Sequence, residues 1–356
     1  MKHLGQLLTL PGSGVFTVHT GQERKDKILK SYFGTASHTK AHQLWLKSIK
    51  NISTSKPLII GIPSDCGGGI HRGANWGPLA LREEMISEKN HFQDLGDVRV
   101  IPHLLHDKYI NQETIRLCRK SLYGKDIKLP VSPLSIAEKA LELIYDSYPS
   151  AKILGLGGDH STSYPLVKSW LSSRKNKKKC ALIHFDAHTD LLDKRLGIDL
   201  CFGTWAYHIL NSLSSPDHII QLGIRSSGKS KKYWKETLGV EQYWADEINR
   251  LGVNKTYQKI KKHFNKLGVE DIYVSFDIDA LDAKYASTTG TPEVNGLLPS
   301  DCAALLHLLK ADFNITGADL MEVAPFISFE RKNESDRIAS LAVAGDMAKL
   351  LLNLLK

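Results

Sequence analysis

Short apolar runs alternate along the chain with longer amphipathic stretches. The runs are apolar throughout and do not alternate with polar residues, which is typical of strands that are covered on both faces. They predict eight strands, at Pro57 to Ile62, Asp97 to Ile101, Lys152 to Leu156, Cys180 to Phe185, His218 to Leu222, Val240 to Trp244, Ile272 to Phe276 and Thr316 to Met321.

The segments between these runs have helical periodicity. They predict helices that include Ile136 to Tyr145, Val253 to Leu267, Asp301 to Leu309 and Asp336 to Leu355. Strands and helices in alternation indicate an open α/β domain of three layers, with a parallel sheet between helices. Functional residues of such sheets gather in the loops that follow the carboxyl ends of the strands.

The first 55 residues differ from the remainder of the chain. They are rich in Lys, His, Ser and Thr, and only Ala41 to Ile49 has a helical pattern. We interpret residues 1–55 as an N-terminal extension packed on the core, and residues 56–356 as a single domain that holds the chemistry.

Composition excludes several classes of protein. The chain has 356 residues with 42% hydrophobic and 24% charged side chains, which excludes disordered, collagenous and fibrous proteins. No apolar run approaches the roughly 18 residues of a membrane span, and the N-terminus lacks the pattern of a secretion signal. Five scattered cysteines without a CxxC pair argue against a disulfide framework. We therefore expect a cytoplasmic protein without a membrane partner.

Three of the predicted strands lead directly into side chains that bind metals. The sequence Gly-Gly-Asp-His occupies residues 157–160, Asp-Ala-His-Thr-Asp occupies 186–190, and Asp-Ile-Asp occupies 277–279. Residues two apart in an extended segment project to the same side, so the acids and imidazoles within each motif can converge. The candidate metal ligands are His160, Asp186, His188, Asp190, Asp277 and Asp279.

Four carboxylates in one cleft repel one another unless cations neutralise them. Together with two imidazoles they form too large and too acidic a set for one structural zinc, and their oxygen atoms favour Mn²⁺. We therefore expect two Mn²⁺ ions that share bridging carboxylates, with Ni²⁺ and Co²⁺ as alternatives. Metal binding lowers the pKa of water from about 15.7 towards 7, so this centre favours hydrolysis.

Individual residues near the motifs have more specific interpretations. Asp190 can accept a hydrogen bond from the attacking hydroxide and is a candidate catalytic residue. We interpret His184 as a hydrogen-bonded core histidine, Asp282 as a residue that fixes its own loop, and Asp159 as the cap of the turn that presents His160.

Together these motifs resemble those of the ureohydrolases, the superfamily of arginases, agmatinases and formimidoylglutamases. The resemblance extends from about Ile59 to the C-terminus. Gly68 to Pro78 resembles the early Gly-rich segment of the family, and Thr288 to Glu293 is similar to the agmatinase-type loop. Leu320 to Pro325 resembles the segment whose Glu holds the substrate guanidinium, which would be Glu322 here.

The resemblance implies a three-layer fold around an eight-stranded, mainly parallel sheet and a dinuclear Mn²⁺ centre. It also implies hydrolysis of a C–N bond in a small, cationic guanidino or amidino substrate. Glu322 would pair with the planar guanidinium as both catalytic and substrate-binding residue. Family members form trimers or hexamers, so the resemblance implies a homo-oligomer.

One position departs from the arginase and agmatinase pattern. Their proton-shuttling His is replaced by Phe202, which cannot carry a proton. Formimidoylglutamases also often lack that His. Of two histidines that could substitute, His71 in the Gly-rich segment is our candidate catalytic residue, and His208 is interpreted as a surface or packing residue.

Four functions remain open from the sequence. The Thr-Gly-Thr-Pro-Glu loop favours an agmatinase-like enzyme that releases urea and an amine, and Phe202 favours a formimidoylglutamase that releases formamide and glutamate. A third alternative is a metal-binding paralogue without activity. The fourth, a nucleic-acid-binding protein, is suggested by the +9 charge and the basic runs Arg174 to Lys179 and Lys229 to Lys235. Most charge runs are solvated loops, so we expect no nucleic-acid partner.

Overall fold

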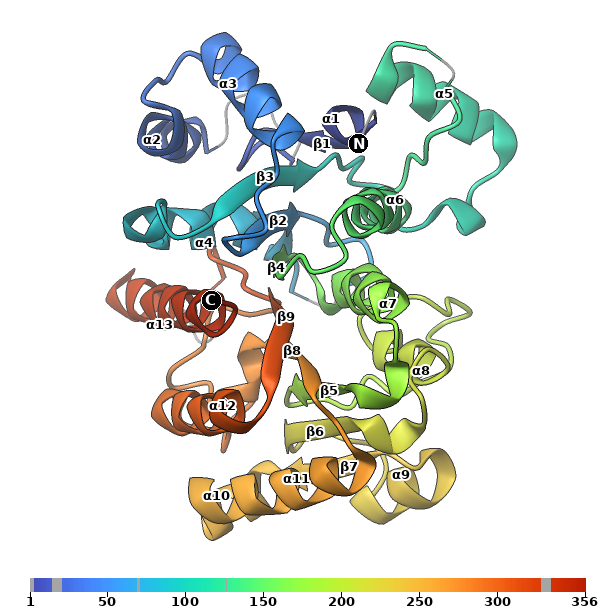
Figure 1. The fold of residues 1–356 in the computed structure, drawn as a ribbon, viewed down its shortest axis with the longest axis vertical. Coiled ribbons are helices and arrows are strands. Elements are labelled where there is room, and N and C mark those ends of the chain that lie inside the picture. The colour runs from blue at the N-terminus through green and yellow to red at the C-terminus, as the bar shows by residue number, and fades with distance from the viewer. Residues whose placement is uncertain (1–2, 15–20, 69–70, 126, 328–333) are drawn as a thin grey trace.

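A twisted sheet runs through the molecule, and helices cover both of its faces (Figure 1). The computed structural model describes residues 3–14, 21–68, 71–125, 127–327 and 334–356. Within these residues the sheet has nine strands, which lie in the order β1 (Leu8–Thr9), β3 (Gln93–Val98), β2 (Leu58–Ile62), β4 (Ile153–Gly157), β9 (Asn314–Met321), β8 (Asp271–Asp277), β5 (Cys180–Phe185), β6 (Ile219–Ile224) and β7 (Glu241–Trp244). Neighbouring strands are parallel except for β1 and β3.

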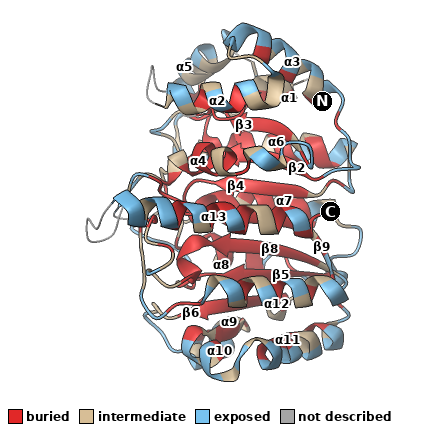
Figure 2. Ribbon diagram, turned by 90° about the vertical axis from the view of Figure 1, so that its left-hand side faces the viewer, coloured by how far each residue is buried: buried red, intermediate tan, exposed pale blue. Residues whose placement is uncertain are grey.

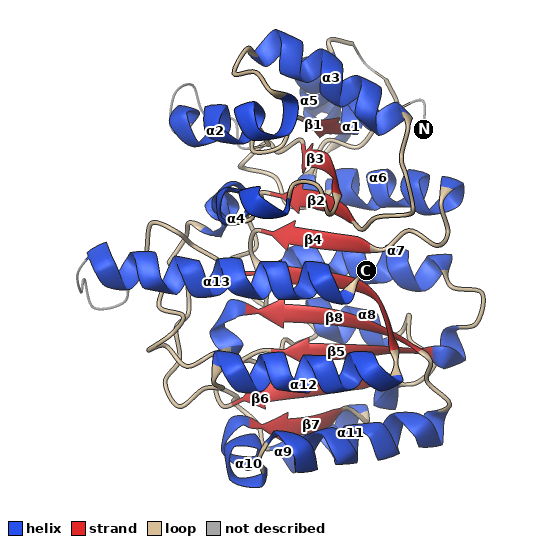
Figure 3. Ribbon diagram, turned by 60° about the vertical axis from the view of Figure 1, so that its left-hand side comes forward, coloured by secondary structure: helices blue, strands red, loops and turns tan. Residues whose placement is uncertain are grey.

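The helices form two layers and a group at the β1 end of the sheet (Figures 1 and 3). One layer contains α4 (Gly77–Glu84), α10 (Ala245–Leu251), α11 (Val253–Leu267), α12 (Pro299–Asp312) and α13 (Glu334–Leu354). The other contains α6 (Pro133–Ser147), α7 (Ser163–Ser173), α8 (Trp205–Leu210) and α9 (Lys231–Leu238). At the β1 end lie α1 (Leu4–Leu7), α2 (Gln22–Phe33), α3 (His38–Lys50) and α5 (Gln112–Tyr123).

The predicted three-layer α/β architecture is confirmed, and the sheet has one strand more than the eight that we expected. Each predicted strand overlaps one of the strands β2 to β9. The additional strand is β1, which pairs antiparallel with β3 through Leu8 and Thr9. Because β1 has two residues, it carries no periodicity that a sequence pattern could reveal.

The strand predicted at Asp97 to Ile101 is displaced, since β3 spans Gln93–Val98. Its Asp94, Gly96 and Asp97 interrupt the apolar pattern, and yet all three are buried. The two carboxylates can be buried because each pairs with Arg82 of α4. Because the pairing joins residues of α4 and β3, the sequence of β3 alone does not indicate that its aspartates are buried, and the pattern of apolar residues misplaced the strand.

The described part of residues 3–55 extends the β1 end of the sheet. Only α3 was predicted there, and α2 was missed. Trp45 of α3 is buried and its Nε1 donates to the Leu95 carbonyl of β3 at 3.0 Å. The backbone N–H of Gly14 donates to Asp97 at 3.1 Å. The segment therefore packs on the sheet, and the division at residue 55 remains a prediction.

The strands form the buried centre of the molecule (Figure 2). Every residue of β2, β4, β5 and β6 is buried, which accounts for their largely apolar sequences, with His184 and Gln221 as the buried polar exceptions. The parallel register pairs Leu156 with Leu320, Leu320 with Phe276, and Phe276 with Phe185. The central strands β4, β9, β8 and β5 consequently end side by side, and the loops that follow them meet at one edge.

Arg82 joins α4 to β3 through a buried ionic cluster. Its side chain is fully buried, and Nε and Nη2 donate to the two carboxylate oxygens of Asp94 at 2.7 and 3.1 Å. Nη1 donates to Asp97 at 2.5 Å. Removing the cation would leave two buried carboxylates without their partner, which is far more costly than loss of a surface ion pair.

We expect Arg82→Met to lower the free energy of unfolding by about 3–5 kcal/mol, because Asp94 and Asp97 stay buried without a counter-charge. Urea denaturation measures this change. The control is Lys139→Met, which removes an exposed ion pair with Glu142 and should cost less than about 1 kcal/mol. Equal losses in the two variants would contradict a role for Arg82 in stability.

Candidate metal centre

The central strands of the sheet carry the residues of the candidate site. His160 begins the turn that follows β4, and the segment 186–190 follows β5. Asp277 is the last residue of β8, and Asp279 lies in the turn after it. Glu322 follows β9, which lies between β4 and β8. Because these parallel strands end at one edge, all these side chains meet there.

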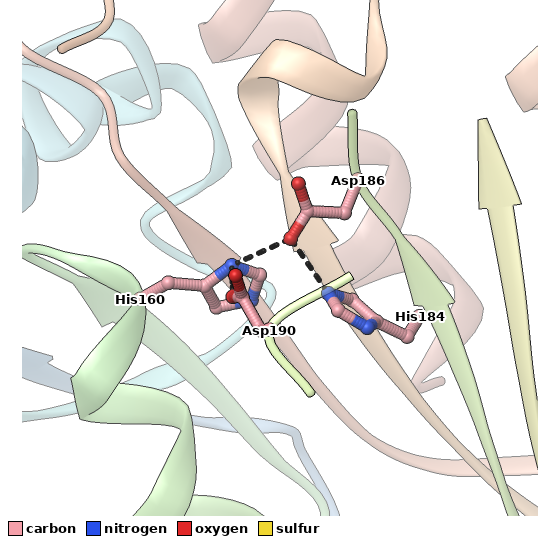
Figure 4. A group of neighbouring side chains, drawn as sticks. All are labelled: His160, His184, Asp186 and Asp190. Carbon is pink, nitrogen blue, oxygen red and sulfur yellow. Dashed lines mark hydrogen bonds and ion pairs between the residues drawn. The ribbon is translucent and has the colours of Figure 1, made fainter. Parts of the chain in front are cut away.

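The first group of ligand atoms surrounds the His160 ring. Its Nδ1 lies 3.0 Å from an Asp277 oxygen, 3.1 Å from an Asp186 oxygen and 3.3 Å from an Asp190 oxygen. Figure 4 shows Asp186 placed between His160 and His184. This Nδ1 is buried and has no hydrogen bond of acceptable geometry within the described residues. A buried nitrogen that faces three carboxylates without a hydrogen bond is placed as metal ligands are.

A second group lies around His188. Its Nδ1 is 3.1 Å from Asp279 Oδ2 and 3.4 Å from Asp186 Oδ1. The other oxygen of Asp186, Oδ2, is the one that faces His160. Asp186 therefore presents one oxygen to each group, which is the arrangement of a carboxylate that bridges two metal ions. The structure thus brings together all six residues that the sequence selected as ligands.

Burial and mutual repulsion perturb the charges of these groups. Burial, reinforced by the charge of Asp186, raises the pKa of Asp190 well above its usual range. Burial and Asp279 do the same to the pKa of Asp277. Burial also acts against ionisation of Asp186, but its close contacts with His160, His184 and His188 lower its pKa well below the usual range. The carboxylates therefore need more positive charge than the imidazoles supply, and a pair of oxygen-binding divalent cations fits this donor set.

A hydrogen-bond chain sets the tautomer of His160. The Ser275 hydroxyl donates to Asp319 at 2.8 Å, so it accepts a hydrogen bond from His160 Nε2–H at 3.1 Å. Tyr273 donates to the other Asp319 oxygen at 2.9 Å. With the proton on Nε2, the Nδ1 lone pair is directed at the carboxylates. We missed Ser275 and Asp319 in the sequence, although polar residues within apolar strands were the available signal.

Other side chains orient the acids. Gln221 donates to His184 Nδ1 at 2.9 Å, so His184 Nε2–H donates to Asp186 at 2.8 Å, and His184 is a hydrogen-bonded buried histidine, as we interpreted it. Trp205 Nε1 donates to Asp190 at 2.8 Å. We missed this role of Trp205, which lies three residues after the anomalous Phe202.

Two acids near the site have the supporting roles that their loops suggested. Asp159 caps the turn that presents His160 by accepting from the Ser161 N–H at 2.9 Å. Asp282 accepts from the N–H groups of Lys284 and Gly296, each at 2.9 Å, and so fixes its own loop. Neither needs a metal to explain its position.

Backbone strain is concentrated at two of the candidate residues. Asp190 has φ of 52° and Glu322 has φ of 62°, and they are two of four non-glycine residues with positive φ in the described ranges. Such conformations persist where the surrounding contacts hold them. For Glu322 these contacts are its Oε1, which accepts from the His160 N–H at 2.8 Å, and its own N–H, which donates to the Gly158 carbonyl at 2.9 Å.

The two proton-transfer candidates have different surroundings. The His71 side chain is exposed, and Gly69 and Ile70 before it lie outside the described residues. Gly290 lies close to both the His71 backbone and the Glu322 side chain. A Cβ atom built on Gly290 would be 2.6 Å from the His71 carbonyl oxygen and 3.8 Å from Glu322 Oε2. The His71 backbone is therefore near Glu322. His208 Nε2 is engaged by the Asp193 carbonyl at 3.0 Å, as expected for a packing residue.

Comparison with known proteins gives one consistent result. The model of the arginase family matches residues 55–347. An agmatinase of Chromobacterium violaceum is 32% identical over 298 residues, 83% of each chain. The mitochondrial guanidino acid hydrolase of Homo sapiens is 31% identical over 284 residues, 75% of this chain and 70% of that one. The solved structure of proclavaminate amidino hydrolase from Streptomyces clavuligerus has a TM-score of 0.64 at 26% identity and covers 84% of this chain and 91% of its own.

The family match covers most of the chain, including every strand-end motif. It confirms the resemblance to ureohydrolases and the corresponding enzyme class, a hydrolase that acts on guanidino C–N bonds. On the evidence of its motifs, its fold and its relatives, this chain belongs to the arginase family.

Proposed function

We propose that the chain is a dinuclear manganese hydrolase that cleaves the C–N bond of a linear guanidino compound and releases urea and an amine. The observation that carries this proposal is the position of Asp186, whose two oxygens face two separate histidine-containing groups. Asp190 and Asp277 complete the group around His160, and Asp279 completes the group around His188. These six residues would hold the two metal ions.

The protein side chains around the centre have distinct tasks. When bound, two Mn²⁺ ions lower the pKa of a water molecule, so a nucleophile forms near neutral pH. Asp190, whose Oδ2 is held by Trp205, would orient that nucleophile as well as bind metal. Ser275 holds the His160 ring and His184 holds the Asp186 carboxylate, so these two side chains do not have to reorganise during the reaction.

Glu322 would hold the guanidinium of the substrate. It is buried, and its Oε1 accepts from the His160 N–H, which leaves Oε2 available to a ligand. Burial, and then the charges of Asp277 and Asp159, raise the pKa of Glu322 well above its usual range. A cationic guanidinium stabilises the ionised form and can donate to it through planar, paired N–H groups.

His71 would deliver a proton to the departing amine. Phe202 stands where arginases and agmatinases have their shuttle histidine and has no ionisable group. The His71 backbone lies beside Gly290, close to Glu322, so this loop can reach the substrate from the Glu322 side. That position supports His71 over His208, whose ring is engaged by the Asp193 carbonyl.

Phe202 also favours a second candidate function, formimidoylglutamase activity that releases formamide and glutamate.

The basic runs give less support to nucleic-acid binding, because Lys179, Lys231 and Lys235 pair with Glu270, Glu247 and Glu241. No helix in the described ranges is both long and apolar enough to cross a bilayer. The homo-oligomer, trimeric or hexameric, and the cytoplasmic location remain predictions.

The reaction is tested by incubating the Mn²⁺-loaded protein with agmatine, arginine, 4-guanidinobutyrate, guanidine and formimidoylglutamate. We expect urea from at least one guanidino compound. Formamide as the sole product would instead identify a formimidoylglutamase, and a protein that holds two metals but turns over none of the five would be the inactive paralogue.

Metal binding should stabilise the fold, because the ions relieve repulsion among buried carboxylates. At free Mn²⁺ a hundred times its Kd, we expect the free energy of unfolding to rise by about 2.7 kcal/mol for each of the two occupied sites. Calorimetry with and without chelator measures the shift, and elemental analysis counts the ions. Asp186→Asn should lose at least one of the two ions, whereas the control Asp282→Asn should keep both, since Asp282 bonds only its own loop. Equal metal content in the two variants would exclude Asp186 as a bridge.

Glu322→Gln should lower kcat/KM for the guanidino substrate by roughly 10- to 150-fold, the equivalent of a charged hydrogen bond of about 1.5–3 kcal/mol. The metal content should not change. Steady-state kinetics of urea release give the ratio, with Glu241→Gln on the distant strand β7 as the control. A variant that retains full kcat/KM would remove Glu322 from substrate binding.

His71→Ala should lower kcat by roughly 10²-fold with unchanged metal content, because the leaving amine loses its proton donor. In the plot of kcat against pH, the fall in rate that accompanies deprotonation of the His71 imidazole should disappear. Rates are measured across pH on the same substrate, beside His208→Ala as the matched histidine control. If the rate profile of His71→Ala equals that of the unaltered protein, His71 has no part in the mechanism.

A further inference from the structure

A cavity of about 520 Å³ lies directly beside the metal centre. His188 and Asp190 form part of its wall, so it is continuous with two of the proposed metal ligands. The remaining wall comes from the loop after β5, helix α8, the loop after β6, and helix α9. A substrate whose guanidinium is at the metals can therefore extend its other end into this space.

Among the described residues, two cationic side chains line the cavity. Arg195 lies in the loop after β5 and Lys229 in the loop after β6, and these strands are neighbours in the sheet. Both side chains are exposed. In the part of the chain that the structure describes, their charged ends contact aromatic rings and no carboxylate: Arg195 Cζ lies 4.6 Å from the Phe202 ring centroid, and Lys229 Nζ lies 5.3 Å from that of Tyr233.

Lys229 differs in this respect from neighbouring lysines of the same basic run. Lys231 pairs with Glu247 at 2.6 Å, Lys232 with Glu236 at 3.7 Å, and Lys235 with Glu241 at 3.0 Å. The three lysines that do not line the cavity thus pair with nearby glutamates, whereas Lys229, which lines it, has no such pair among the described residues. Among the described residues that line the cavity, Asp193 is the one acid apart from the metal ligand Asp190, so two cations there share a wall with a single further carboxylate.

Phe202 has a positive role in this arrangement. Its ring lies in the cavity wall and forms the platform on which the Arg195 guanidinium rests. A planar guanidinium held in this way retains N–H groups that can donate to a carboxylate in a paired geometry. The residue that replaces the family's shuttle histidine therefore helps to place a cation in the cavity.

We propose that the substrate carries a carboxylate at the end opposite to its guanidino or amidino group, and that Arg195 and Lys229 select it. This inference rests on the proposed function, because it assumes that the cationic end reaches the metal centre. A carboxylate is attracted by two cations that lack an acidic partner, whereas the ammonium end of agmatine is repelled by them. The substrate class is then ω-guanidino acids, or formimidoyl amino acids if the product is formamide.

The test compares 4-guanidinobutyrate with agmatine, which share the guanidinium and a short methylene chain but carry tails of opposite charge. With the Mn²⁺-loaded protein we expect kcat/KM for urea release to be at least about tenfold higher for 4-guanidinobutyrate than for agmatine, because the two cations attract its carboxylate and repel the ammonium group. Equal or better turnover of agmatine would overturn the proposal.

Variants identify the residues that read the tail. Arg195→Gln and Lys229→Gln should each raise KM for 4-guanidinobutyrate by roughly tenfold while kcat and metal content stay close to their original values. Arg195→Glu should shift the preference towards agmatine. The control is Lys232→Gln, an exposed α9 residue that does not line the cavity and should leave KM unchanged. A loss in kcat with unchanged KM would mean that Arg195 and Lys229 do not bind the carboxylate of the substrate.

Two further measurements separate this inference from the proposed function. If formimidoylglutamate alone is turned over, with formamide as product, the carboxylate preference is supported while urea release is excluded. If no compound is turned over, calorimetric binding of 4-guanidinobutyrate and agmatine to the metal-loaded protein still compares the tails. Tighter binding of the acid, lost in Arg195→Gln, supports the inference, and equal binding overturns it.

Discussion

Repulsion among buried carboxylates is the constraint around which this molecule is organised. Four aspartates and Glu322 are enclosed at one edge of the sheet, and burial opposes the ionisation of Asp190, Asp277 and Glu322. Two imidazoles cannot neutralise them, so the site favours added cations at the metal centre and a cationic substrate at Glu322. Hydrogen bonds from Trp205, His184 and the His160 backbone hold the acids in place against this repulsion.

The fold makes such an accumulation of charge tolerable. Strands β4, β9, β8 and β5 are buried on both faces, and their apolar contacts supply the free energy that holds their charged ends together. The residues that bear strain, Asp190 and Glu322, come directly after this rigid part of the sheet. Beyond them, the loops after β5 and β6 carry Arg195 and Lys229. The chemistry is thus fixed by strands, whereas the recognition of a substrate's far end depends on loops.

Sequence patterns located the elements whose burial is uniform and failed where polar residues are buried through tertiary contacts. Val253 to Leu267 was predicted to the residue, because its helical face is strongly apolar. The strand β3 was displaced because Asp94 and Asp97 are buried only through Arg82, and β1 was too short to have a pattern. Helix α2 was missed because its residues are mostly polar. Of its twelve side chains three are buried, which is too few to give a clear apolar periodicity.

The sequence by itself determined which donor atoms each strand end offers, because spacing within a motif such as Asp186 to Asp190 is a local property of the backbone. Only the tertiary structure decided that three motifs form one centre, that Asp186 faces both His160 and His188, and that Glu322 follows β9, the strand between β4 and β8. The physical reason is that strand order is decided by the packing of the whole sheet. Contacts between residues more than a hundred positions apart leave no trace in local periodicity.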